Sequence, residues 1–145
     1  MEDITIRKAK KEDYQEVIRL YGLFVENKTR YQDHDNDSFN KVIDDSNTFL
    51  EVACIGEKTV AFIVYSIRNV VRYPKPIIEV EEFFVLEEFR RKRIGQKLMD
   101  RVFAIAKEKQ CEYVFLASSK DRIAAHNFYK NYGFDEYAFH YRKRP

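Results

Sequence analysis

Glycine, proline and cysteine are all scarce in this chain. Its 145 residues include four glycines, three prolines and two cysteines. Pro74 and Pro76 fall in one turn and Pro145 ends the chain. We find no internal repeat, no low-complexity tract and no Gly/Ser/Pro linker. Residues 1–145 are therefore expected to form a single domain, long enough to bury a core.

Clustered metal ligands are also missing. Cys54 and Cys111 lie far apart and lack the spacing of a metal site. The histidines, His34, His126 and His140, are scattered as well. No metal site is expected, and the cysteines are interpreted as two buried thiols in a reducing compartment.

Long apolar segments are absent too. No apolar run approaches the roughly 20 residues that span a bilayer, and the first residues, MEDITIRKAKKED, show no stretch of signal-peptide type. We therefore expect a cytoplasmic protein without a membrane partner. A net charge of +2 is too small to indicate a general nucleic-acid binder. Positive charge is instead local, at residues 90–93 and 142–144.

Hydrophobic periodicity predicts a mixture of strands and helices. Strands are expected at 4–7, 48–55, 59–67, 77–86, 113–117 and 134–141. Helices are expected at 12–25, 38–45, 93–109 and 122–131. The strand, helix and strand from residue 77 to 117 predict one parallel, right-handed crossover.

A basic segment joins strand 77–86 to the following helix. Four cations, residues 90–93, precede Ile94 and Gly95, where the helix begins. The N–H groups and positive dipole end of a helix N-terminus attract anions, and side-chain cations add charge. The segment therefore predicts a phosphate site, although a solvated run of charges would look similar.

Two motifs together resemble those of the GCN5-related N-acetyltransferase (GNAT) family. The acetyl-CoA motif, Arg/Gln-x-x-Gly-x-Gly/Ala, is matched by Arg90 and Gly95. The second motif, Ala-x-x-x-Tyr-x-x-x-Gly-Phe, is matched by Ala125, Tyr129, Gly133 and Phe134. The element order is similar to the family's fold over essentially the whole chain. This implies an α/β (α+β) fold with a mixed central sheet of six to seven strands and about four flanking helices.

Two positions depart from the family pattern. Arg93 stands where the first glycine of the phosphate loop is expected, and Arg122 stands where the family often has asparagine. They leave open an alternative function, a CoA-binding or regulatory module with impaired catalysis.

The resemblance implies acetyl-CoA as co-substrate. The loop would hold its pyrophosphate, and the backbone of Phe83 and Val85 would pair with pantetheine. The residues expected to bind the cofactor are Phe83, Phe84, Val85, Arg90, Arg91, Lys92, Arg93, Ile94, Gly95, Gln96, Ala125 and Phe128.

The implied reaction is direct attack of a primary amine on the thioester in a ternary complex. An alkyl ammonium, with a pKa of about 10.4, must first lose a proton, and a carboxylate can accept it. Glu79 and Glu81 share one strand face, and Glu82 lies on the other unless a bulge shifts the parity. Glu82 and Glu79 are the favoured bases because family bases fall near these positions.

Tyr129 matches the family's tyrosine, which protonates the leaving thiolate. The alternative for Tyr129 is a packed helix aromatic beside Phe128. His126 is expected to have a structural or solvent role.

The acceptor site is expected from the first two helices and the loop at 68–76. Its candidate residues are Phe24, Tyr31, His34, Asp35, Asp37, Tyr65 and Tyr73. Asp33, Asp35 and Asp37 would attract a cationic amine, or would cap a helix. The substrate is a small-molecule amine whose identity stays open: a polyamine, an aminoglycoside, an aminoalkyl compound or an amino acid, with a protein terminus as another option. The final strand makes a homodimer possible.

Overall fold

The structure is a computed structural model that describes residues 3–24 and 35–145. The chain divides into two compact units, Met1–Phe115 and Leu116–Pro145. Each unit is described by itself, and the single domain expected from the sequence stays a prediction.

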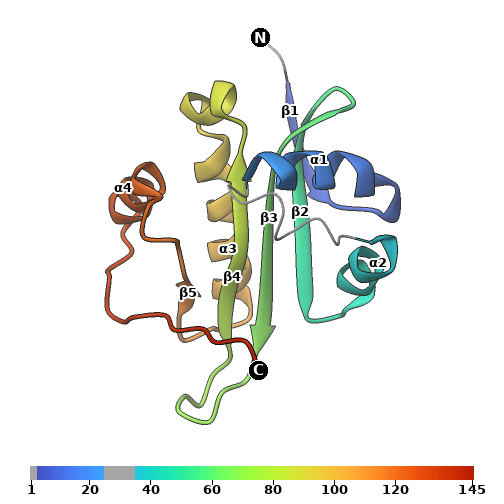
Figure 1. Cartoon of the computed structure of the whole chain (residues 1–145). Helices are drawn as coiled ribbons and strands as arrows, with labels where there is room; N and C mark the ends of the chain where they lie inside the picture. The colour runs from blue at the N-terminus through green and yellow to red at the C-terminus, as the bar shows by residue number, and fades with distance from the viewer. Residues whose placement is uncertain (1–2, 25–34) are drawn as a thin grey trace. The chain divides into compact units, whose positions relative to one another are not determined.

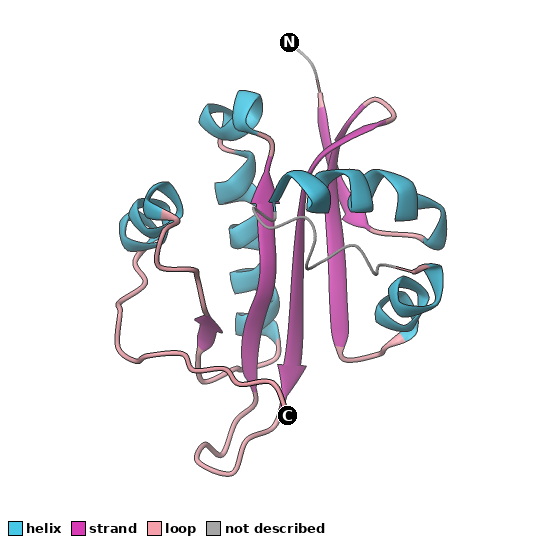
Figure 2. Cartoon of the chain, viewed as in Figure 1, coloured by secondary structure: helices cyan, strands magenta, loops and turns pink. Residues whose placement is uncertain are grey.

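The first unit is built on a five-stranded sheet (Figures 1 and 2). Its strands are adjacent in chain order: β1 (Ile4–Lys8), β2 (Thr48–Ile55), β3 (Lys58–Arg68), β4 (Ile77–Val85) and β5 (Val114–Leu116). The pairs β1–β2, β2–β3 and β3–β4 are antiparallel. Beside the start of β4, the Ile78 N–H donates to the Tyr113 carbonyl at 3.0 Å. The five predicted strands from residue 4 to 117 are thus confirmed.

Helices cover both faces of this sheet. The first unit holds a short 3-10 helix η1 (Lys11–Asp13), α1 (Tyr14–Phe24), α2 (Asn36–Asp44), a second 3-10 helix η3 (Glu87–Lys92) and α3 (Ile94–Glu108). α1 crosses in front of the sheet, and α3 runs behind it (Figure 1). The fourth predicted helix is α4 (Ile123–Tyr132), in the second unit. The predicted end of the first helix, residue 25, lies outside the described residues.

The core lies between these layers. Leu20 of α1 is fully buried, and so are Leu98 and Val102 of α3. They pack with buried apolar residues of β3 such as Phe62 and Ile63. Spacings of three and four residues along each helix turn these side chains toward the sheet. Apolar burial, worth about 25 cal/mol per Å², therefore holds the helices that position the site.

The predicted strand at 134–141 is wrong, so the described sheet has five strands rather than six to seven. Residues 134–145 form no strand, although Tyr137, Phe139 and Tyr141 alternate as a strand would. Alternating side chains give a segment one apolar face, but a stable strand also needs a neighbouring strand with which to form backbone hydrogen bonds. In the second unit α4 is the only regular element that lies entirely within residues 116–145, and a helix offers no such edge.

The Gly133-Phe134 pair ends α4 in a Schellman motif. Gly133 has φ of 118°, and its N–H donates to the Lys130 carbonyl at 3.1 Å. The Phe134 N–H donates to the Tyr129 carbonyl at 3.0 Å, and the two rings lie 5.9 Å apart. This combination of a left-handed residue, two reverse bonds and an apolar contact is typical of helix ends. The second motif therefore includes a helix stop that holds Tyr129 in the last turn.

We expect the substitution of alanine for glycine to have opposite effects at two positions. A Cβ would meet open space at both Gly22 and Gly133. Gly133→Ala forces a side chain into a positive φ and should lower the free energy of unfolding by about 1 kcal/mol. Gly22→Ala, inside α1, should raise it by about 0.5–1 kcal/mol. Urea unfolding of both variants checks this, and the same sign at both positions would contradict it.

Candidate active site

A β-bulge in β4 organises the candidate site. On β3, Val64 lies opposite Glu82 and its neighbour Tyr65 lies opposite Val80. Glu81 is therefore an extra residue in β4 with no counterpart in β3. An inserted residue of this kind shifts the alternation of side chains along its strand.

The bulge brings three carboxylates to one face. Glu79 lies opposite Ser66, and Glu82 lies opposite Val64, two residues earlier on β3. Residues two apart share a face, and the Ser66 hydroxyl also donates to Glu81 Oε1 at 3.1 Å. Glu79 and Glu81 share a face, as expected. The bulge moves Glu82 to that same face, which is the exception that the sequence left open.

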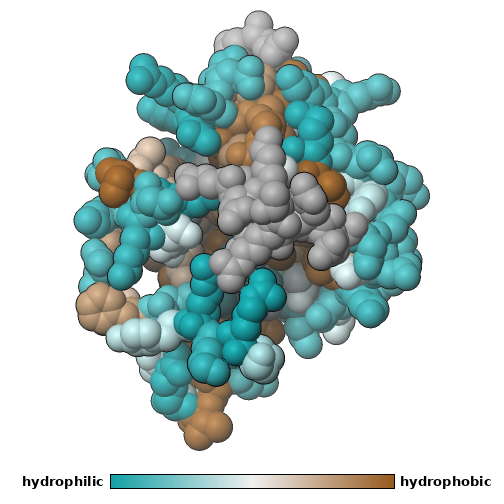
Figure 3. Space-filling model, in the orientation of Figure 1, coloured by the Kyte–Doolittle hydropathy of each residue, from teal (hydrophilic) through white to brown (hydrophobic). Residues whose placement is uncertain are grey.

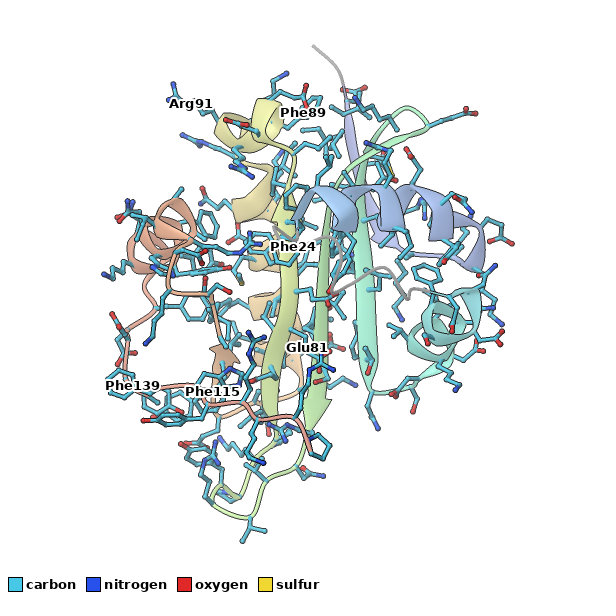
Figure 4. The ribbon with its side chains drawn as sticks, viewed as in Figure 1. Phe24, Glu81, Phe89, Arg91, Phe115 and Phe139 are labelled. Atoms are coloured by element: carbon cyan, nitrogen blue, oxygen red, sulfur yellow. The ribbon has the colours of Figure 1, made fainter. Side chains whose placement is uncertain are left out.

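Helix α1 covers this face and gives Glu82 its surroundings. The Tyr21 hydroxyl donates a hydrogen bond to the Glu82 carboxylate. One turn later, the Phe24 ring lies 5.5 Å from Phe84 of β4 (Figure 4). Burial raises the pKa of Glu82, and the neighbouring Glu81 charge raises it further, while the Tyr21 bond lowers it. Glu82 is thus a half-buried carboxyl with a raised pKa, which makes its carboxylate a better proton acceptor than that of an ordinary glutamate.

Sequence reasoning missed Tyr21 as a site residue. The available signal was its position, three residues before Phe24, on the helix face that also holds Val17. A helical pattern shows that a side chain faces the sheet, but it does not reveal which strand residue the side chain meets.

The backbone of Phe83 and Val85 is directed away from β3. The Leu86 N–H donates to Val60 of β3 at 2.9 Å, and successive residues of a strand point their backbone groups to opposite sides. The groups of Phe83 and Val85 therefore face the side of β4 opposite to β3. This orientation is the one needed to pair with an extended ligand.

The basic segment occupies η3 and the start of α3. Arg91, Lys92 and Arg93 are exposed, and Arg91 extends away from the ribbon in Figure 4. In Figure 3 hydrophilic side chains at this end flank a hydrophobic patch. Arg90 turns back instead: its Nε donates to the Val85 carbonyl at 2.9 Å, and its guanidinium lies 5.8 Å from the Phe84 ring. Arg90 thus closes the turn that leads out of β4.

Arg93 adopts the backbone conformation that glycine takes most easily. Its φ is 62° and its ψ is 18°, and it forms the N-cap of α3. The Lys97 N–H donates to its carbonyl at 3.0 Å, so the first helical turn is regular. The loop keeps its left-handed residue despite the loss of the expected glycine. Exposed cations and helical N–H groups at this end fit a diphosphate.

The acceptor-site predictions have mixed outcomes. Tyr31, Asp33 and His34 lie outside the described residues. Asp35 is the N-cap of α2: its Oδ1 accepts from the Ser38 N–H at 2.6 Å, and this bond lowers the pKa of Asp35. Capping, the alternative interpretation, is therefore confirmed for Asp35.

Tyr65 was wrongly placed in the acceptor site. It is 1% exposed and lies on the opposite face of β3, where its hydroxyl donates to Glu51. Tyr65 follows Val64 directly on β3, and consecutive residues of a strand point to opposite faces. Tyr65 therefore faces α3 rather than α1. Tyr73 packs against Tyr113, with ring centroids 5.3 Å apart, in the loop beyond β3.

In the second unit, α4 carries the other candidate residues. Ala125 and Tyr129 are four residues apart and share a helix face, and Phe128 stacks on Tyr132 at 6.1 Å. Burial raises the pKa of Tyr129 to about 12, and the Arg122 charge opposes this shift. His126 Nε2 bonds the Ser119 carbonyl at 2.8 Å, which gives this ring a structural partner.

Within residues 3–24 and 35–145, no cluster of three metal-ligating side chains is present. No helix of this described part is long and apolar enough to cross a membrane.

Comparison with known proteins assigns the chain to a family. The model of the acetyltransferase (GNAT) family matches residues 7–134. The chain belongs to the GNAT family. An uncharacterized N-acetyltransferase of Archaeoglobus fulgidus is 30% identical over 130 residues, which cover 86% of this chain and 88% of that protein. An uncharacterized N-acetyltransferase of Dictyostelium discoideum is 37% identical over 65 residues. That match covers 45% of this chain and only 30% of the relative.

Solved structures share the GNAT fold. A transcriptional regulator from Bacillus halodurans C-125 has a TM-score of 0.88 at 23% identity, covering 98% of this chain and 99% of that one. An aminoglycoside acetyltransferase from an uncultured soil metagenomic sample, in complex with sisomicin, has a TM-score of 0.85 at 22% identity, covering 98% and 96%. An aminoglycoside N-acetyltransferase in complex with CoA has a TM-score of 0.80 at 20% identity, covering 100% and 97%. The mixed α/β fold expected from the motifs is thereby confirmed.

GNAT enzymes use acetyl-CoA, and this chain is an acetyl-CoA-dependent N-acyltransferase. The enzyme class predicted from the two motifs is confirmed.

We expect Arg93→Gly to stabilise the protein. A residue other than glycine pays about 1–2 kcal/mol for the left-handed conformation, while glycine adds disorder to the unfolded chain. The free energy of unfolding in urea should rise by up to about 1 kcal/mol. Arg91→Gly, inside η3, is the matched control and should lower it by about 0.5–1 kcal/mol. A clear destabilisation by Arg93→Gly would show that its side chain makes contacts worth more than the strain.

Proposed function

We propose that the protein moves the acetyl group of acetyl-CoA to the primary amine of a small cationic molecule. The carrying observation is the position of Glu82, half-buried beneath α1, bonded to Tyr21 and flanked by Glu79 and Glu81 on the same strand face. Two structural neighbours named as aminoglycoside acetyltransferases support a small polar amine as acceptor.

In the proposed reaction, Glu82 accepts a proton from the bound ammonium, and the amine nitrogen then attacks the thioester carbonyl. The N–C bond forms, the C–S bond breaks, and the electron pair moves to sulfur. The nitrogen then loses a second proton to solvent, which leaves a neutral amide. Glu79 and Glu81 supply negative charge that attracts the cationic acceptor. Since the Glu82 pKa is raised by burial, its carboxylate is a stronger base than an ordinary glutamate.

Tyr129 is proposed as the acid that meets the leaving thiolate. With a pKa of about 12, the phenol is fully protonated at neutral pH and holds a proton to give. Its transfer to a thiolate, with a thiol pKa of about 8.5, is unfavourable by itself. The positive charge of Arg122 lowers the Tyr129 pKa and reduces that cost.

We propose that the exposed cations and the first turn of α3 hold the pyrophosphate of acetyl-CoA, as the family's use of this cofactor requires. Phe83 and Val85 would bind pantetheine through backbone hydrogen bonds. Ala125 and Phe128 would line its channel.

A homodimer and a cytoplasmic location also stay proposals. Tyr137, Phe139 and Tyr141 are 67%, 77% and 87% exposed, and an apolar alternating segment of this kind suits pairing with a second copy. Analytical ultracentrifugation measures the oligomeric state directly.

A panel of amines tests the proposed function. The purified protein is mixed with acetyl-CoA and each of several polyamines, aminoglycosides, aminoalkyl compounds and amino acids, and release of free CoA is followed. We expect CoA release to depend on the presence of at least one of the amines. Mass spectrometry should then detect the N-acetyl product of that amine. Hydrolysis of acetyl-CoA at the same rate with and without every amine would contradict the proposal.

Glu82→Gln should remove the base and lower kcat/KM for the amine by about 10²–10⁴-fold. In the wild type, log kcat/KM should rise with pH through the Glu82 pKa, which lies above the ordinary value of about 4.3. Glu82→Gln should abolish this acid limb. Glu81→Gln is the matched control: it should mainly raise KM for the amine and keep the limb. An acid limb that survives in Glu82→Gln would exclude Glu82 as the base.

Tyr129→Phe should lower kcat by about 10²–10⁴-fold and change the affinity for CoA by less than about threefold. The hydroxyl is lost while the ring that packs on Phe134 is kept. Tyr132→Phe is the matched control, because Tyr132 follows Tyr129 by three residues, about one helical turn, on α4. This variant should keep wild-type activity. Equal loss of turnover and CoA affinity, or no loss, would count against the acid role.

A further inference from the structure

A charged network lies on the face of the sheet opposite to the candidate active site. Glu51 of β2 is 3% exposed, although it carries a carboxylate. Its Oε2 accepts from the Tyr65 hydroxyl at 2.8 Å, and its Oε1 accepts from Arg101 Nε at 2.6 Å. Arg101 Nη2 also lies against Oε1. Three elements, β2, β3 and α3, therefore meet at one buried carboxylate.

The partners of Glu51 are themselves firmly held. The Tyr65 ring is 1% exposed and stacks on Phe49, with centroids 5.2 Å apart and an interplanar angle of 15°. Burial and the Glu51 charge both raise the Tyr65 pKa, so its hydroxyl stays a donor. β2 pairs antiparallel with β3 from Thr48, opposite Ser66, to Ile55, opposite Lys58. Tyr65 and Glu51 thus form a rigid acceptor to which Arg101 attaches α3.

Net stability is a poor explanation for this network. Glu51 is the buried member of the pair, since the Arg101 side chain is 45% exposed. Burying its carboxylate costs desolvation, and an apolar residue of similar volume often serves stability as well or better. What the contact of two Arg101 nitrogens with Glu51 adds is a defined orientation of α3 relative to the sheet. The buried residues of α3, such as Leu98, Met99 and Val102, pack through apolar contacts, which resist rotation or sliding of a helix less specifically.

Position along α3 links this contact to the cofactor end. Arg101 follows Ile94 by seven residues, two turns, on nearly the same face of the helix. If the helix rotated by about 20°, backbone atoms at a radius of about 2.3 Å would move by about 0.8 Å. Displacements of this size are enough to misplace groups in a binding site. Fixing Arg101 therefore fixes the N–H groups of the first turn.

We propose that Glu51, Tyr65 and Arg101 are positioning residues, which set the rotation and register of α3 so that its first-turn N–H groups meet the pyrophosphate of CoA. The inference rests on the proposed cofactor site. It assigns control over cofactor affinity, rather than over chemistry, to a network that is centred on the buried Glu51 carboxylate and lies on the other face of the sheet from Glu82.

The decisive comparison separates stability from position. CoA binding is measured by isothermal titration calorimetry, and stability by urea unfolding, for Arg101→Met and for the double variant Glu51→Met with Arg101→Met. Arg101→Met leaves an unpaired buried carboxylate and should be unstable. The double variant should recover wild-type stability, yet bind CoA about tenfold more weakly. Its kcat at saturating acetyl-CoA should stay within about twofold of wild type, while KM for acetyl-CoA rises.

Two further variants sharpen the test. Tyr65→Phe keeps the stacked ring and removes one hydrogen bond, and it should weaken CoA binding by about two- to threefold. Arg7→Met breaks an ion pair with Asp13, with Nη1–Oδ2 at 2.7 Å, between β1 and η1. It should lower stability without changing CoA affinity.

Recovery of both stability and CoA affinity in the double variant would overturn the proposal, and so would wild-type affinity in every variant of the network. Failure of the cofactor site itself has a different signature. In that case Arg91→Ala together with Lys92→Ala would leave CoA affinity unchanged, whatever the network variants do.

Discussion

The candidate active site depends on one irregularity in the hydrogen-bond ladder between β3 and β4. Glu81 is inserted opposite no residue of β3, so the alternation of side chains shifts by one between Val80 and Glu82. Without this bulge, Glu82 would face α3 instead of α1. With it, Glu82 lies under α1 beside Tyr21 and shares a face with Glu79 and Glu81. Backbone register thereby decides which carboxyl has a raised pKa.

The same strand continues into the cofactor end of the molecule. Arg90 closes the turn on Val85, and Arg93 takes the left-handed conformation that starts α3. On the other face, Glu51 and Tyr65 bind Arg101 of α3. The proposed base therefore lies on one face of the sheet, and the network proposed to position α3 lies on the other. Substitution of Glu82 is expected to change turnover, and substitution in the network is expected to change cofactor affinity.

Local patterns predicted the parts of the structure that depend on local physics. Helical spacing located α1 to α4, and Gly133-Phe134 correctly indicated where α4 ends. Features that depend on distant partners were less accessible. The alternation of Tyr137, Phe139 and Tyr141 predicted a strand that the structure does not form, because a pattern cannot supply a neighbouring edge. The sequence allowed for a bulge that would move Glu82 to the other strand face, but it could not place a bulge at Glu81. Only the pairing of β4 with Val64 and Tyr65 of β3 reveals its position. Tyr21 was missed for the same reason: its partner is 61 positions along the chain, as the numbers of Tyr21 and Glu82 show.

The most direct test of this account is a titration of the Glu82 carboxyl by ¹³C NMR, with Glu82→Gln used to assign its resonance. The account predicts a pKa above the ordinary glutamate value of about 4.3, and a further rise in Tyr21→Phe, which removes the hydrogen bond that lowers it. A Glu82 pKa at or below about 4.3 that is unchanged by Tyr21→Phe would contradict it. Such a result would mean that the bulge does not bring Glu82 beneath α1.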